Sequence, residues 1–167
     1  MRLEHVNPVV KAALDVLRTE LATEVKRGQV SVVRDNSKGH DLTILIAVTG
    51  ALEGVLAYAL DEQVACGMAS AMMGEEFTEL DELVQSGVAE VGNVISGRAM
   101  MVLADQGLDT QIAPPVLLIG HDAKISTLNI PRLLVPLELP FGTLNMHIAL
   151  KPAAAASSAA RRPSAVA

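Results

Sequence analysis

The residues best suited to chemistry lie in one stretch, ELDELVQSGVAEVGNVISGRAMMVLADQG (residues 79–107), whose hydrophobic spacing predicts a helix. At about 100° per residue, four of its small or polar residues fall within a sector of roughly 60°: Ser86, Glu90, Asn93 and Gly97. A carboxylate and a carboxamide three residues apart therefore point the same way, into solvent, from one rigid element. The spacing predicts a docking face with two projecting polar groups.

Gly97 strengthens this interpretation because glycine inside a helix costs on the order of 1 kcal/mol relative to alanine. Close helix packing explains Gly87, which lies towards the apolar side, but it explains Gly97 less well. A glycine one turn beyond Asn93 leaves the face low and open, so that another backbone or protein surface can approach. Asn93 is itself a mediocre helix former with no intrinsic reason to lie in the middle of a helix.

The Glu-x-x-Asn spacing is weak evidence by itself, because the chain contains it a second time. Glu4 and Asn7 are also three residues apart, but Asn7 is followed by Pro8, a combination typical of a helix start. We interpret Asn7 as a helix cap. On spacing alone, the better interpretation of Glu90 and Asn93 is that they are simply solvated residues of a helix face.

Other familiar catalytic patterns are absent from the sequence. Four histidines are scattered without metal-ligand spacing: His5, His40, His121 and His147. The glycine-rich phosphate loops and the Gly-x-Ser-x-Gly nucleophile motif do not occur. The single Cys66 has no nearby histidine in the sequence to activate it, and we interpret it as a small buried hydrophobic residue. No metal site is expected on this chain.

Three helices are predicted to carry and support the docking face. The first runs from about Pro8 to Val25, the second follows Asp61 as its cap and ends near Gly74, and the third runs from Thr78, its expected cap, to about Gln106. On the third, the residues expected to face the core are Leu80, Val84, Val88, Val91, Ile95 and Val102.

Short β-type runs separated by glycine and proline turns account for most of the remaining sequence. They cover residues 30–34, 42–49, 54–60, 115–120, 125–129, 133–139 and 144–150. We expect the first three to form an antiparallel meander and the last two to form a hairpin around the turn at residues 140–143.

The composition limits the function classes. The 167 residues carry 13 Lys+Arg against 19 Asp+Glu, for a net charge of −6, with 50% hydrophobic and 2% aromatic residues. Residues 1–151 are expected to form one folded domain, and residues 152–167, rich in Ala, Ser, Pro and Arg, a disordered tail. An acidic chain with few aromatics is poorly suited to bind nucleic acid. Its apolar runs are too short to span a membrane and its start lacks a signal-peptide core, so we expect a cytoplasmic protein without a membrane partner.

The segment SGVAEVGNVISGRA (residues 86–99) resembles the signature of the CheC/CheX/FliY family of chemotaxis phosphatases. That signature is Asp or Ser, three residues, Glu, two residues, Asn, and a Pro about twenty residues further. Ser86, Glu90, Asn93 and Pro114–Pro115 fit it. Further segments resemble CheX in the same order: VNPVV, ILIAVTGALEGVLAYAL, SAMMGEEF with ELDEL, and IAPPVLLIG. The similarity covers roughly residues 3 to 151.

The resemblance implies a fold and an activity. The implied fold class is α+β, a two-layer arrangement of long helices packed on an antiparallel sheet, with dimers joined through their sheets. The implied activity is removal of the phosphoryl group from the aspartyl phosphate of a CheY-type response regulator. The regulator would supply Mg²⁺ and a lysine near that group, so no cofactor is expected on this chain.

The same resemblance assigns roles to individual residues. Asn93 would orient the attacking water, and Glu90 would pair with the regulator's lysine and fix the register of docking. Ser86 matches the signature and would keep the face small and polar, and Gly97 would keep it open. Arg98 adds a positive charge beside the site.

Two alternatives remain open at this point. A non-catalytic adaptor would use the same helix face to bind a response regulator or a flagellar-switch component. A small-molecule sensor built on the same scaffold has no sequence feature in its favour.

Overall fold

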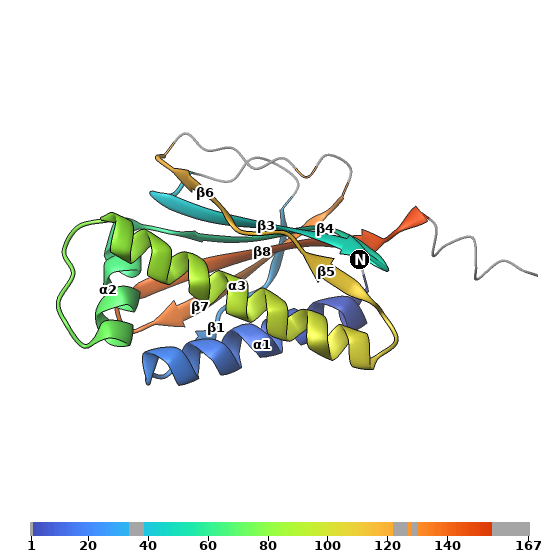
Figure 1. Cartoon of the computed structure of the whole chain (residues 1–167), viewed down its shortest axis with the longest axis horizontal. Coiled ribbons are helices and arrows are strands. Elements are labelled where there is room, and N and C mark those ends of the chain that lie inside the picture. The colour runs from blue at the N-terminus through green and yellow to red at the C-terminus, as the bar shows by residue number, and fades with distance from the viewer. Residues whose placement is uncertain (1, 34–38, 122–126, 128–129, 155–167) are drawn as a thin grey trace, which may run out of the picture.

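The computed structural model describes residues 2–33, 39–121, 127 and 130–154, which form three helices packed on one eight-stranded antiparallel sheet (Figure 1). The helices are α1 (Leu3–Leu21), α2 (Glu62–Met73) and α3 (Glu82–Asp105). The strands are β1 (Lys26–Arg27), β2 (Ser31–Val33), β3 (Leu42–Gly50), β4 (Leu52–Leu60), β5 (Thr110–Ile112), β6 (Val116–Ile119), β7 (Arg132–Leu139) and β8 (Gly142–Pro152). The predicted fold class is confirmed.

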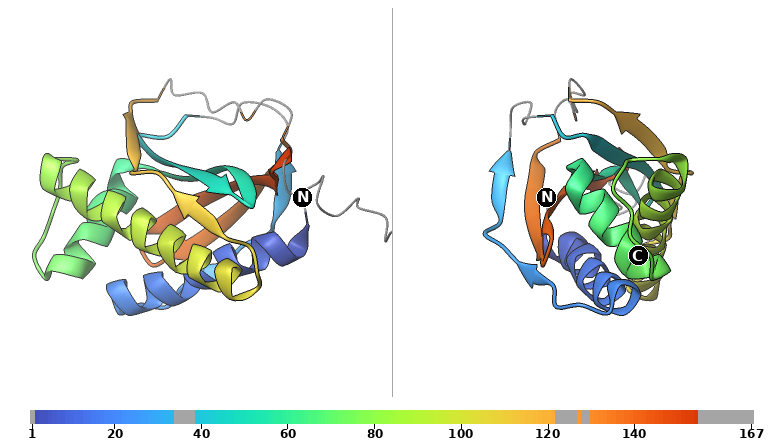
Figure 2. Two further views of the ribbon diagram at one scale, coloured as in Figure 1. Left: turned by 45° about the vertical axis from the view of Figure 1, so that its right-hand side comes forward. Right: turned by 90° about the vertical axis from the view of Figure 1, so that its left-hand side faces the viewer.

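The sheet has the order β1-β7-β8-β4-β3-β5, with β2 also on β7 and β6 also on β3. Viewed end-on, it curves partly around the helices (Figure 2). The expected hairpin β7–β8 is present, and so is the pairing of β3 with β4 that the expected meander requires. The expected meander is wrong at its first step, because β2 pairs with β7. Strand β3 already has β4 on one edge and β5 and β6 on the other, so no edge is left for β2.

The start of α1 differs from the prediction. The helix begins at Leu3, so Asn7 lies inside it and is not a cap. Pro8 lacks the N–H that would donate to the carbonyl of Glu4. The first turn stays helical nonetheless because His5 and Val6 are buried in the core. The helix ends at Leu21, before the predicted Val25, where Ala22 adopts a left-handed conformation with φ of 47°.

The caps of the other two helices also differ. Asp61 occupies the N-cap position of α2, but its side chain does not cap the helix. Asp41 does so instead, since its Oδ2 accepts a hydrogen bond from the Glu62 N–H at 2.7 Å. Helix α3 is capped by Asp81, whose Oδ1 accepts from the Val84 N–H at 2.8 Å, and not by Thr78.

The core-facing side of α3 agrees with the sequence except near its end. Val84, Val88, Val91 and Ile95 are buried, and Leu80 packs against the core just before the helix. Val102 is 36% exposed, so its predicted burial is wrong. Only three helical residues follow it, and the buried side chains of those last turns are Ala99, Met100 and Leu103.

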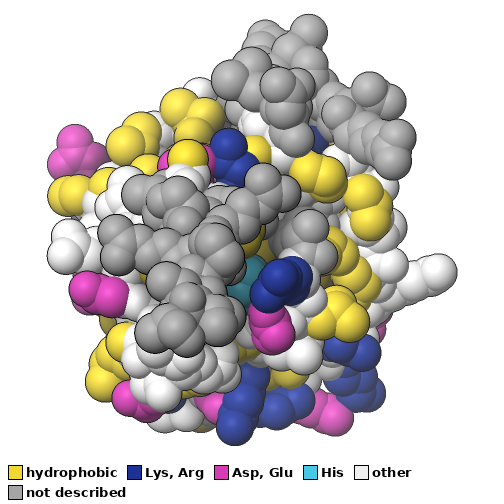
Figure 3. Space-filling model, turned by 90° about the vertical axis from the view of Figure 1, so that its right-hand side faces the viewer, with side chains coloured by type: hydrophobic (Ala, Val, Ile, Leu, Met, Phe, Trp, Pro, Cys, Tyr) yellow, Lys and Arg dark blue, Asp and Glu magenta, His cyan; other side chains and the backbone are white. Residues whose placement is uncertain are grey.

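The last strand passes the predicted domain boundary. β8 continues to Pro152, and the Ala153 N–H donates to the Ala51 carbonyl at 3.0 Å. Residues 155–167 of the predicted tail lie outside the described residues, as does nearly all of the predicted strand 125–129. The end of the molecule where the chain leaves β8 shows acidic and basic side chains interspersed among the described residues, without a continuous field of either sign (Figure 3).

His147 makes folding stability depend on pH. It lies on β8, is 2% exposed, and its Nδ1 has no hydrogen-bond partner. Burial, followed by the charges of Arg132 and His40, lowers its pKa to about 4 from the ordinary 6.5. Only the unfolded chain therefore takes up a proton as the pH falls from 6.5 towards 4, and this favours unfolding.

We expect the free energy of unfolding to fall by about 2 kcal/mol between pH 8 and pH 5 through this residue. Urea unfolding at the two pH values measures the loss. Other groups also titrate, so the wild type is compared with His147→Gln. Between pH 8 and pH 5, the free energy of unfolding of this variant should fall by about 2 kcal/mol less than that of the wild type. An equal loss in both proteins would show that His147 does not carry the effect.

Candidate docking and catalytic face

Helix α3 carries all five of the residues predicted to form the site. In Figure 1 it crosses the front of the molecule, and no other element of the described chain covers its outer side. Ser86, Glu90 and Arg98 are exposed, while Asn93 and Gly97 are half-buried. Among the described residues, Glu90 and Asn93 have no hydrogen-bond or ion-pair partner. Both side chains are therefore free to engage another molecule.

The opposite side of α3 fixes how the helix lies on the sheet. Ser96 Oγ donates to the Gly92 carbonyl at 2.8 Å, and it lies 2.8 Å from the buried hydroxyl of Tyr58 on β4. Because the Ser96 hydroxyl donates to the Gly92 carbonyl, the Tyr58 hydroxyl is the donor of the hydrogen bond between them, and burial raises the pKa of Tyr58 so that it stays protonated. This buried contact sets the rotation of α3 and hence the direction of the exposed face.

Gly92 allows the close approach that this contact requires. A Cβ at Gly92 would lie 3.2 Å from Cδ2 of Tyr58 and 3.4 Å from Cγ2 of Ile44. Those distances are tighter than ordinary van der Waals contact, so a side chain there would push the helix away from the sheet.

The first turn of α3 is held from two sides. Asp81 caps it, and Glu62 Oε1 on α2 accepts from the Leu80 N–H at 2.9 Å. Gly87 is also close to α2, because a Cβ there would meet the terminal methyl of Met73 at 3.0 Å. Packing thus accounts for Gly87, as the sequence indicates. The helix that carries Glu90 and Asn93 is a fixed platform.

Gly97 differs from the other glycines of α3. A Cβ at this position would meet nothing within 4 Å. No neighbour in the described part of the chain excludes a side chain here. Packing therefore does not explain why the helix has a glycine at this position, where alanine would make it more stable. The face beside Asn93 is open at this point.

A cleft lies beside the exposed face, between α3 and β6. Its volume is about 410 Å³ and it is lined by Glu82, Gln85, Ser86, Ala89, Glu90, Pro115 and Leu117. The fold thus brings Pro115 next to Ser86 and Glu90, although it is 25 residues beyond Glu90 in the chain. Asn93, Gly97 and Arg98 do not line this cleft.

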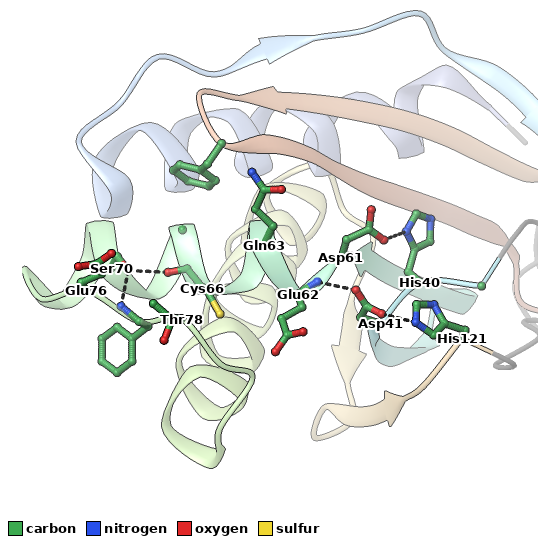
Figure 4. Close-up of a pocket in the computed structure, with 14 residues that line it drawn as sticks. His40, Asp41, Asp61, Glu62, Gln63, Cys66, Ser70, Glu76, Thr78 and His121 are labelled. Atoms are coloured by element: carbon green, nitrogen blue, oxygen red, sulfur yellow. Dashed lines mark hydrogen bonds and ion pairs between the residues drawn. The ribbon is translucent and has the colours of Figure 1, made fainter.

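A larger cavity of about 960 Å³ lies against α2 (Figure 4). Four of its titratable groups form two pairs: His40 Nδ1 lies 2.9 Å from Asp61 Oδ1, and His121 Nε2 lies 2.7 Å from Asp41 Oδ1. The sequence gives no signal for this group because its members are scattered along the chain and meet only through the fold.

Cys66 forms part of the wall of that cavity and is 5% exposed. Burial, with the nearby carboxylate of Glu62 as the next cause, raises the pKa of its thiol. The predicted burial of Cys66 is therefore confirmed. A protonated thiol is also a poor nucleophile.

The described residues offer neither a metal cluster nor a membrane-spanning helix. They contain no group of three or more His, Cys, Asp or Glu side chains that could hold a metal ion. None of their helices is both long and apolar enough to cross a bilayer.

Comparison with known proteins places the chain among chemotaxis proteins. A family model described as chemotaxis phosphatase CheX matches residues 42–138, which include α3. The CheY-P phosphatase CheX of Thermotoga maritima is 33% identical over 152 residues, 87% of this chain and 95% of that protein. A CheC-like superfamily protein from Shewanella sp. PV-4 has a similar structure, with a TM-score of 0.84 and 27% identity over 90% of this chain and 99% of that one. CheX in the CheX–CheY–BeF₃–Mg²⁺ complex from Borrelia burgdorferi has a TM-score of 0.79 and 29% identity, over 90% of this chain and 99% of that one.

Proposed function

Because this chain belongs to the CheX family of chemotaxis phosphatases, we propose that it hydrolyses the aspartyl phosphate of a CheY-type response regulator. The observation that carries the proposal is the pair Glu90 and Asn93, which project without partners from the uncovered side of a rigid helix. The CheX–CheY complex among the similar structures supports a protein of the CheY type as the partner.

Asn93 is proposed to position the attacking water. In the reaction the water oxygen forms a bond to phosphorus while the bond from phosphorus to the aspartate oxygen breaks, releasing phosphate and a carboxylate. The amide oxygen of Asn93 accepts a hydrogen bond from the water and so aims its lone pair at phosphorus. An amide does not titrate near neutral pH, so it holds the water without exchanging a proton. Catalysis here is mainly positioning.

Glu90 is proposed to fix the register of docking. It lies one turn before Asn93 on the same side of α3, and its carboxylate is exposed. An ion pair with the regulator's lysine would set the distance between Asn93 and the phosphoryl group. The regulator is proposed to carry Mg²⁺, which offsets charge on the phosphoryl oxygens, and we assign no resident metal to this chain.

The remaining site residues shape the surface. Ser86 keeps the rim of the cleft between α3 and β6 small and polar, and Gly97 leaves room for the regulator's backbone. Arg98 offers a positive charge at the margin of the face. We further propose that the protein acts in the cytoplasm and as a homodimer joined through the sheet.

Release of inorganic phosphate from a Mg²⁺-bound, phosphorylated CheY-type regulator tests the function. Catalytic amounts of the protein should accelerate release well above the regulator's own rate. Binding of the phosphorylated regulator without any acceleration would instead identify the non-catalytic adaptor.

Gly97→Ala separates stability from activity. The substitution should stabilise α3 by up to about 1 kcal/mol, because alanine is the better helix former and its methyl group meets nothing within 4 Å. We expect the same methyl group to obstruct the regulator and to raise KM by roughly 10-fold, the cost of a steric mismatch of about 1.4 kcal/mol. Urea unfolding and phosphate release on one preparation measure both effects. A stabilised protein with unchanged KM would show that the face needs no opening at Gly97.

A further inference from the structure

Exposed hydrophobic side chains are concentrated on the outer side of α3. Nine large hydrophobic residues are exposed among the described residues, and four of them belong to this helix: Leu83 (51%), Val94 (37%), Met101 (70%) and Val102 (36%). At about 100° per residue, the first three point within roughly 40° of the direction of Glu90, and only Val102 points elsewhere.

Leu83 and Met101 bracket the polar pair along the helix axis. Leu83 precedes Glu90 by two turns, and Met101 follows Asn93 by slightly more than two turns. At 1.5 Å per residue they are roughly 27 Å apart, with the polar pair and the gap at Gly97 between them. The outer side of α3 is therefore apolar at both ends, and its middle carries the polar pair beside the exposed Val94.

This arrangement differs from ordinary surface scatter. Single exposed hydrophobic residues are normal on soluble proteins and need no explanation. Here three of them share one side of one helix with two unpartnered polar groups, and apolar side chains gathered on one face in this way are typical of interaction sites. The burial pattern of α3 indicates a surface that another protein covers.

The charges around these residues limit what that protein can be. The ionised side chains of α3 are Glu82, Glu90, Asp105 and Arg98, so the helix carries three negative charges against one positive charge, a net charge of −2. A matching surface offers apolar groups at two separated points and a cation between them. That is the chemistry of a lysine set among apolar side chains.

We propose that Leu83 and Met101 are the two apolar anchors that hold the phosphorylated regulator on α3, on either side of Glu90 and Asn93. The inference rests on the proposed function and adds the source of docking affinity to it. The anchors lie too far along the helix to touch the reacting atoms, so they stabilise the ground state and the transition state of hydrolysis equally. Uniform binding of this kind lowers KM and leaves kcat unchanged.

The test is steady-state phosphate release with Leu83→Ser, Met101→Ser and the double variant, over a range of concentrations of Mg²⁺-bound phosphorylated regulator. Each single change should raise KM about 10-fold, the effect of losing one buried apolar side chain at an interface, with kcat within twofold of wild type. Met101→Leu should retain the wild-type KM. Val32→Ser, which removes an equally exposed hydrophobic side chain on β2, is the matched control and should change neither constant.

A direct binding measurement keeps the inference independent of turnover. Titration with the BeF₃-activated, Mg²⁺-bound regulator should show the same loss of affinity in the anchor variants, even if wild-type protein releases no phosphate and the proposed activity fails. Unchanged affinity in the double variant would overturn the inference. So would a fall in kcat at unchanged KM, or a change from dimer to monomer by light scattering without loss of regulator binding, because the face would then be a contact between copies of this chain.

Discussion

Replacing Asn93 with alanine is expected to lower kcat for phosphate release at least about 100-fold, while the Kd for the phosphorylated regulator stays within about twofold. The amide is the group proposed to aim the water, and a methyl group can neither accept nor donate a hydrogen bond. The backbone of α3 should not move, because the helix is held from its other side by Ser96 and Tyr58. Phosphate release and regulator titration, run on one preparation, measure the two constants.

The chain provides a matched control for Asn93→Ala. Glu4 and Asn7 repeat the same spacing on α1, and Asn7 is exposed within that helix. The carboxylate of Glu4 is already engaged, 3.0 Å from Arg2 and 3.6 Å from His5. Asn7→Ala should therefore leave kcat unchanged. Equal losses in the two variants, or a loss of affinity equal to the loss of kcat in Asn93→Ala, would contradict the proposed role.

The two copies of the spacing also show what the sequence can and cannot establish. Helical periodicity places Glu90 and Asn93 on the solvent side of α3, because the buried side is fixed by residues such as Val88 and Ile95. The same arithmetic applies to Glu4 and Asn7, so spacing cannot distinguish a functional Glu-x-x-Asn pair from a chance occurrence of the same spacing. The distinction comes from the family resemblance and from the fold, which leaves one carboxylate free and engages the other.

Contacts between distant parts of the chain account for the errors. The pairing of β2 with β7 joins residues about one hundred positions apart, and no local pattern specifies it. The early start of α1 depends on the burial of His5, which is a tertiary effect that overrides the local signal from Asn7 and Pro8. The approach of Pro115 to Glu90 and the pairs around the cavity against α2 are likewise produced by the sheet topology.

Substitutions at Glu90 should act on docking rather than on the water. Glu90→Ala removes the charge proposed to pair with the regulator's lysine, and we expect kcat/KM to fall roughly 100-fold, which corresponds to about 3 kcal/mol for a desolvated ion pair that loses one partner. Glu90→Gln keeps a hydrogen-bond acceptor, so its kcat/KM should fall less than that of Glu90→Ala. Glu90→Lys places a second cation beside the regulator's lysine, so its kcat/KM should fall more. This order, Gln above Ala above Lys, is what an electrostatic contact requires.

Ionic strength provides a second, independent readout of the same contact. A charge pair that assists encounter weakens as salt is added, so kcat/KM of the wild type should fall with ionic strength more steeply than that of Glu90→Gln. Glu82→Gln is the matched control, since Glu82 is an exposed carboxylate on the same helix that lines the same cleft. It should retain kcat/KM within about threefold, as is usual for a charge at the rim of an interface. If Glu82→Gln and Glu90→Gln lost activity equally, the general negative charge of the helix would govern docking, and Glu90 would have no specific partner on the regulator.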